Sequence, residues 1–304
     1  MATTLTALRR QIASAGDLKS VVRTMKVSAA SAIGQYERSV AALADYANTV
    51  ELGLSVCLRS ATVENSPVPL LKLQHDIVRH IVILGSDQGL VGRFNESVVQ
   101  HAIIELTKEK STLITTKVWV IGERAHARLI DAGITPEGCF SLPNSVERIT
   151  RLVGEILLKV EQPEGTNMAE TQSTALILFY NRPVCSGYQP VSQQVLPLDE
   201  NWRSGLTHQA WPTTQLPEVL GNSTQTLCAF LREHLFVSLF RACAESLACE
   251  NACRLAAMQR ADRNIGELLE QLQSRFHQLR QSGIDEELFD VISGFDALSA
   301  DDVL

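Results

Sequence analysis

The chain has 304 residues, of which 45% are hydrophobic and 20% are charged, and its formal net charge is −7. The negative charge argues against a nucleic-acid-binding protein, because phosphate contacts require a basic surface. The sequence contains no apolar run near the roughly 18 to 20 residues of a membrane span, and the helical pattern after Met1 lacks a signal-peptide core. We therefore expect a soluble chain of one or two domains that reaches a membrane only through a partner.

The first predicted element is a long helix that begins near Leu5. Apolar residues recur every three or four positions, which is the spacing of one helix face. The helix is expected to end near Cys57 to Arg59, before Pro67 and Pro69. The apolar face consists of Leu5, Leu8, Ile12, Ala15, Leu18, Val22, Met25, Ala29, Ile33, Tyr36, Val40, Leu43, Ala47, Val50, Leu54 and Cys57.

The middle of the chain changes from a helical to an alternating pattern. Short β-branched runs predict strands, and the helical spacing between them predicts helices, which together indicate a small α/β domain with a mainly parallel sheet. Trp202 to Pro217 is expected to connect this domain to the last part of the chain. The predicted strands are Ile77–Leu84, Val118–Ile121, Ala175–Tyr180 and the half-exposed edge strand Val191–Leu198, and the predicted helices are Asn95–Lys110, Glu123–Ala132 and Arg148–Val160.

A second long helix is predicted from Thr224 to Ser282, where proline is absent and apolar residues again follow at three and four. It would have roughly 60 residues and be about 90 Å long. Such a helix needs a partner helix, so the two terminal helices are expected to form an antiparallel coiled coil with small residues in its seam. The predicted domains are residues 1–62, 75–200 and 218–304.

The glycine-rich loop from Gly85 to Gly92 follows a strand and opens a helix, the place where Rossmann folds hold a pyrophosphate. It lacks both G-x-G-x-x-G spacing and the G-K-S/T ending of a P-loop, so tight turning is the preferred explanation. Cys249 and Cys253 lie four apart without further zinc-ligand spacing, and they are interpreted as small packing groups. We expect no cofactor, no metal and no catalytic residue.

Four blocks of sequence resemble one family. They are Ile12-Ala13-Ser14 with Met25-Lys26 and Ala29-Ala30, the loop from Gly85 to Asn95, the run from Leu239 to Met258, and Arg280-Gln281 with Ile284 to Glu287, Asp290 and Gly294. In this order they are similar to the motifs of the gamma subunit of F-type ATP synthases, over essentially the whole chain. The resemblance implies an α/β fold class in which a long antiparallel coiled coil carries an inserted Rossmann-like domain. Asp285 in place of the family's threonine and Phe295 in place of its alanine suggest a divergent branch.

The resemblance also implies a function without catalysis by the chain itself. It implies a central rotor shaft that couples ion flow through the membrane c-ring to ATP synthesis or hydrolysis in the alpha3beta3 ring, at the cytoplasmic face of a bacterial inner membrane. By family position, Met25, Lys26, Arg280, Gln281 and Glu287 would contact the alpha and beta subunits. Phe240, Arg241 and Glu245 would lie toward the epsilon subunit and the c-ring. A coiled-coil scaffold outside any ATPase and a nucleotide-dependent α/β enzyme are the alternatives.

Overall fold

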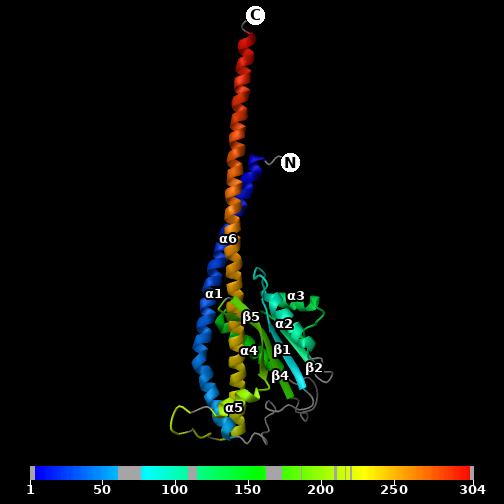
Figure 1. Cartoon of the computed structure of the whole chain (residues 1–304), viewed down its shortest axis with the longest axis vertical. Helices are drawn as coiled ribbons and strands as arrows, with labels where there is room; N and C mark the ends of the chain where they lie inside the picture. The colour runs from blue at the N-terminus through cyan, green and yellow to red at the C-terminus, as the bar shows by residue number, and fades with distance from the viewer. Residues whose placement is uncertain are drawn as a thin grey trace. The chain divides into compact units, whose positions relative to one another are not determined.

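The computed structural model describes residues 4–60, 77–108, 115–161, 173–185, 187–208, 211–215, 217–219 and 221–301. The chain divides into two compact units. Unit 1 consists of Met1–Ser28 and Leu255–Leu304, and unit 2 consists of Ala29–Arg254. Both units contain parts of the long helices α1, Leu5–Ser60, and α6, Ser223–Asp301 (Figure 1). The division of the sequence into 1–62, 75–200 and 218–304 stays a prediction.

The two long helices are confirmed, and α6 is longer than predicted. It has 79 residues and continues past Ser282, where the prediction ended it, to Asp301. The prediction stopped before Gly283, but one glycine in a helix interior costs only about 1 kcal/mol. α1 ends at Ser60, within one residue of the predicted end. Pro67 and Pro69 lie outside the described residues.

Unit 2 contains a five-stranded sheet in the order β3-β2-β1-β4-β5. β1 pairs in parallel with both β2 and β4, β2 pairs in parallel with β3, and only β5 is antiparallel to its neighbour β4. The mainly parallel sheet and its edge strand were predicted, and the fold class is confirmed. The strands are β1 Ile77–Leu84, β2 Thr115–Ile121, β3 Gly138–Phe140, β4 Ser173–Val184 and β5 Gly187–Leu196.

Helices cover both faces of this sheet, which explains why its parallel strands read as nearly continuous apolar runs. One face packs against α2, Phe94–Lys108, and α3, Glu123–Asp131. The other face packs against α4, Val146–Glu161, and against the part of α6 within unit 2, so the long helix shares the core of the α/β domain. α1 joins this core through Tyr36, which is only 4% exposed.

The prediction missed two short elements. β3 has only three residues, too few for a period-two pattern to be recognised in the sequence. The segment from Trp202 was predicted as a connection, but its first residues belong to α5, Glu200–His208. The Asp199 carboxylate accepts a hydrogen bond from the amide of Asn201 at 3.2 Å, in the first turn of this helix. β5 begins four residues earlier and ends two residues earlier than predicted, because its pairing with β4 rather than its own alternation sets its ends.

Unit 1 is an antiparallel pair of helices, as predicted. The Arg9 guanidinium of α1 lies 5.3 Å from the Phe276 ring centroid of α6, and Lys26 of α1 bonds Asp262 of α6. The predicted seam is wrong at Leu5 and Leu18, which are 37% and 57% exposed. Leu18 fits a spacing of three or four residues between its apolar neighbours, and the sequence pattern therefore includes it. A pair of helices buries only the positions that repeat every 3.5 residues on average, and Leu18 is not one of them.

Candidate functional site

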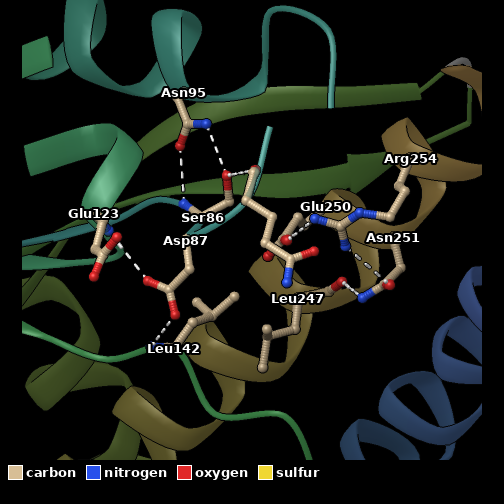
Figure 2. A network of polar contacts seen from close by, with 10 residues as sticks. Ser86, Asp87, Asn95, Glu123, Leu142, Leu247, Glu250, Asn251 and Arg254 are labelled. Atoms are coloured by element: carbon tan, nitrogen blue, oxygen red, sulfur yellow. Dashed lines mark hydrogen bonds and ion pairs between the residues drawn. The ribbon is translucent and has the colours of Figure 1, made fainter. Parts of the chain in front are cut away.

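The carboxyl ends of β1 and β2 meet the glycine-rich loop at one edge of the sheet, where open α/β proteins commonly hold ligands. In this protein, side chains of the same chain make hydrogen bonds with the loop (Figure 2). The Ser86 amide donates to Asn95 Oδ1 at 2.9 Å, and Asn95 Nδ2 donates to Ser86 Oγ at 2.8 Å. Both side chains are buried, so these bonds hold the loop in one conformation.

Asp87 occupies the place at the start of α3 that an anionic ligand would use. Its carboxylate accepts hydrogen bonds from the amide of Glu123 at 3.1 Å and from the amide of Leu142 at 3.0 Å (Figure 2). A helix N-terminus attracts negative charge through its free amide groups and its dipole. Because the protein's own carboxylate already satisfies these amides, the arrangement disfavours a bound phosphate.

Close packing explains two glycines at this edge. A Cβ atom on Gly85 would lie 2.2 Å from the Cβ of Ala125, and one on Gly122 would lie 2.7 Å from the backbone of Ser86. The sequence favoured tight turning as the reason for the glycines of the loop, and close packing is a further reason at Gly85. At Gly85 and Gly122, glycine lets adjoining segments of the chain approach each other.

α6 closes the same edge of the sheet. Cys249 packs with Val91 and Phe94 in a small apolar cluster, against which Tyr188 and Cys253 lie partly buried. Burial raises the pKa of Cys249 to about 12, so its thiol is a packing group rather than a nucleophile. Among the residues that the structure describes, no group of three or more histidine, cysteine or acidic side chains could hold a metal ion.

A buried ion pair lies beside this cluster on α6. Glu250 is only 2% exposed, and its Oε1 pairs with the Arg254 guanidinium at 2.6 Å (Figure 2). Asn251 donates to the carbonyl of Leu247 at 2.8 Å and accepts a longer bond from Arg254 at 3.4 Å. Burial raises the pKa of Glu250, and Arg254 opposes that shift. These polar contacts all lie within α6, and the helix meets the loop edge through the apolar cluster of Cys249.

A second polar cluster contains two of the sequence-predicted contact residues. The buried Glu245 carboxylate accepts hydrogen bonds from Arg241 Nε at 2.7 Å and from Arg182 Nε at 3.3 Å. Arg241 is 61% exposed in its side chain, whereas the predicted contact Phe240 is buried in the core. The spacing of four residues between Arg241 and Glu245 could have predicted their pair. Arg182 lies on β4 and was missed, because no local signal in the sequence brings it to Glu245.

The remaining predicted contact residues lie in unit 1. Met25 and Lys26 are partly buried, and Lys26 donates a 3.0 Å hydrogen bond to Asp262. Arg280, Gln281 and Glu287 are exposed on α6. The structure therefore leaves the α6 residues accessible to another molecule, and it joins Lys26 to a partner within the chain. The roles of all five as contacts to other subunits stay predictions.

A cleft of about 510 Å³ lies between α1, β5 and α6 within unit 2. Its walls are mainly apolar, and the aromatic ring of Trp202 lies tilted against that of His234, with centroids 4.7 Å apart. Burial lowers the pKa of His234 to about 4, so the ring is neutral around pH 7. Glu51, Asp199 and Arg241 are the charged residues in the lining of this cleft.

Comparison with known proteins identifies the family. The chain matches the family model described as ATP synthase over residues 4–298. The ATP synthase gamma chain of Rhizorhabdus wittichii is 27% identical over 303 residues, which cover 97% of this chain and 99% of that relative. The ATP synthase gamma chain of Pelagibacter ubique is 26% identical over 308 residues, with the same two coverages.

Solved structures of ATP synthase chains have a similar fold to this chain. A chain of the Euglena gracilis mitochondrial ATP synthase, solved with OSCP, F1 and c-ring in rotational state 3, superposes with a TM-score of 0.59 at 15% identity. The superposition covers 99% of this chain and 96% of that one. A chain of the Tetrahymena thermophila central stalk and c-ring structure gives 0.54 at 18% identity, covering 79% of this chain and 99% of that one.

The sequence predicted that no segment of this chain spans a membrane. None of the described helices is long and apolar enough to cross a membrane.

The match to the family model includes the start of α1, the whole sheet and α6 almost to its end. Because that match spans nearly the entire sequence, the chain belongs to the ATP synthase family, and the relatives it resembles are the family's gamma chains.

Proposed function

We propose that this chain is the gamma subunit and central rotor shaft of an F-type ATP synthase, coupling ion flow through a membrane c-ring to ATP synthesis or hydrolysis in an alpha3beta3 ring. The family match over residues 4–298 carries the proposal. A shaft that contacts three catalytic sites differently shifts the conformational equilibrium of each site by its differential interaction with that site. Rotation then passes the sites through their states in turn.

The chain itself is proposed to be non-catalytic. The glycine-rich loop supports this proposal, because Asp87 already binds the amides of Glu123 and Leu142 where a phosphate would bind. The neutral thiol of Cys249 supports it too, since the thiol is buried in the apolar cluster. The bond-making steps would belong to the alpha and beta subunits, and this chain would supply mechanical coupling.

The proposed partners are the alpha and beta subunits, the epsilon subunit and the c-ring, with membrane attachment only through them. Arg241 is the best placed of the predicted epsilon and c-ring contacts, because its side chain is exposed. The buried Phe240 and Glu245 would act indirectly, Glu245 by holding the guanidinium of Arg241. The relatives from bacteria support a location at the cytoplasmic face of a bacterial inner membrane.

Purification of the tagged chain in mild detergent tests the proposal. We expect it to bring down alpha and beta subunits in a three-to-three ratio with one copy of this chain, together with ATPase activity, because a shaft is held by the whole ring. Mass spectrometry identifies the subunits and a phosphate-release assay measures turnover. The chain alone should hydrolyse no ATP. Recovery without those subunits would favour the coiled-coil scaffold, and turnover that stays with the isolated chain would favour an enzyme.

Truncation after Ser282 tests the proposed contacts of α6. The variant keeps Arg280 and Gln281 but loses Glu287 and the rest of the helix, whereas every buried cluster of unit 2 lies within residues 29–254. We expect ATP-driven ion pumping to fall severalfold while circular dichroism still reports a folded α/β domain. Alanine replacement of Arg280 and Gln281 together in the full-length chain is the companion measurement. Unchanged pumping in both variants would contradict the assigned contacts.

A further inference from the structure

The seam of unit 1 follows strict intervals of seven residues. On α1, one row buries Leu8, Ala15 and Val22, each less than 8% exposed, and on α6 the deepest positions are Met258 and Leu272. A partly buried second row flanks each of these. Heptad spacing of this kind marks a two-helix coiled coil. The second rows contain Ile12, Lys19 and Lys26 on α1, and Leu255, Asp262, Leu269 and Phe276 on α6.

Charged side chains occupy seam positions in these second rows. Lys26 Nζ lies 3.0 Å from Asp262 Oδ2, and Arg23 Nε lies 3.6 Å from Asp262 Oδ1. The side chains of Lys26 and Asp262 are only 34% and 19% exposed, as expected for partly enclosed seam residues. The hydrogen bond from Lys26 lowers the pKa of Asp262, so the carboxylate stays charged.

Other basic groups also face Asp262, and they come from the same helix as Lys26. Lys19 reaches α6 one turn away, where a Cβ on Gly266 would lie 3.4 Å from its Nζ. Asp262 is therefore the acidic seam position of unit 1 toward which Lys19, Arg23 and Lys26 of α1 converge. The pairing works in one alignment of the two helices.

Within unit 1, the apolar rows alone cannot select that alignment strongly. A shift of seven residues, about 10 Å along a helix, replaces each apolar seam residue by another member of its row. The same shift would place Lys26 opposite Leu255 or Leu269, so Lys26 would lose its carboxylate partner in either direction. Asp262 would face Lys19 in the first of these alignments and would lose its lysine partner in the second. A polar residue at a coiled-coil seam commonly fixes register at some cost in stability, because other alignments leave it without a partner.

We propose that Lys26 and Asp262 are positioning residues that select a single register of α1 against α6 in unit 1. The inference rests on contacts within this chain and does not depend on the proposed rotor function. It gives Lys26 a role other than the contact with another subunit that the sequence predicted. It also explains why a seam position holds a lysine although leucine would bury more apolar area.

The test replaces both members of the pair by leucine, K26L with D262L, in the full-length chain refolded from urea. A photo-crosslinking benzoylphenylalanine at position 9 reports the register, because the Arg9 guanidinium lies 5.3 Å from the Phe276 ring centroid. With Lys26 and Asp262 present, we expect adducts at Phe276 and its neighbours. In the double variant we expect additional adducts at residues three to seven positions away from Phe276, because α1 can then shift against α6. Shifts of fewer than seven residues would be accommodated by local changes in the winding of the coiled coil.

The unfolding midpoint separates register selection from simple stabilisation. Replacement of a partly buried ion pair by apolar residues is commonly neutral or stabilising, so we expect the midpoint of the double variant to be unchanged or higher. The matched control, D17L with R263L, makes the same exchange at exposed positions of the same helices and should keep adducts at Phe276. Adducts confined to Phe276 in K26L with D262L, or a large fall in its midpoint, would overturn the proposal.

Discussion

Replacement of Gly122 by alanine is expected to destabilise unit 2 by about 3 to 5 kcal/mol. Gly122 has a backbone φ of 99°, which an L residue adopts only with strain, and a Cβ atom there would lie 2.7 Å from the backbone of Ser86. The Ser86 backbone cannot move aside freely, because its amide bonds Asn95 and its carbonyl accepts from Arg124 at 2.9 Å. Thermal unfolding should show a midpoint lower by roughly 6 to 20 °C.

Two control substitutions separate backbone strain from the clash. Gly133 has a φ of 80° and open space where a Cβ atom would lie, so Gly133→Ala should cost only the strain, about 1 kcal/mol. Gly154 lies in α4 with open space, and Gly154→Ala should be neutral or stabilise the helix by up to about 1 kcal/mol. If Gly122→Ala cost no more than Gly133→Ala, the loop at Ser86 would be more compliant than its hydrogen bonds indicate.

Lowering the pH from 7.5 to 4 is expected to reduce the stability of the native chain by about 3 kcal/mol relative to a His234→Gln variant. Burial lowers the pKa of His234 from 6.5 to about 4. Between those values the unfolded state binds the proton and the folded state does not, so stability is present above pH 6.5 and is lost as the pH falls toward 4. Urea titrations at a series of pH values measure the difference.

The comparison between variants removes the contribution of other titrating groups. Glu250 works in the opposite direction, because its raised pKa makes stability fall as the pH rises above its unfolded value of about 4.5. That contribution is common to the native chain and His234→Gln and cancels in the difference. His277→Gln is the matched control, since it removes an exposed histidine ring of unit 1. A constant difference between the native chain and His234→Gln at every pH would show that His234 remains hydrated.

The sequence by itself determined the elements whose signals are long or periodic. The apolar face from Leu8 to Cys57 predicted α1 almost to its last residue, and the run from Ile77 to Leu84 predicted β1 with its bounds. Such segments can be recognised locally, because the spacing of their apolar residues matches the geometry of the helix or strand that they form. The ordered motifs at both ends also indicated the family before any contact was known.

Only the tertiary structure decided which polar groups meet. Arg182 joins Glu245 across 63 positions of sequence, and Lys26 joins Asp262 across 236. Spacing within one helix cannot reveal either pair, because the partner comes from another element whose register is set by packing. The same reason explains why the sequence placed Leu18 in the seam and left Lys26 as an outward contact. Which of two neighbouring faces of a helix is buried depends on the helix that packs against it.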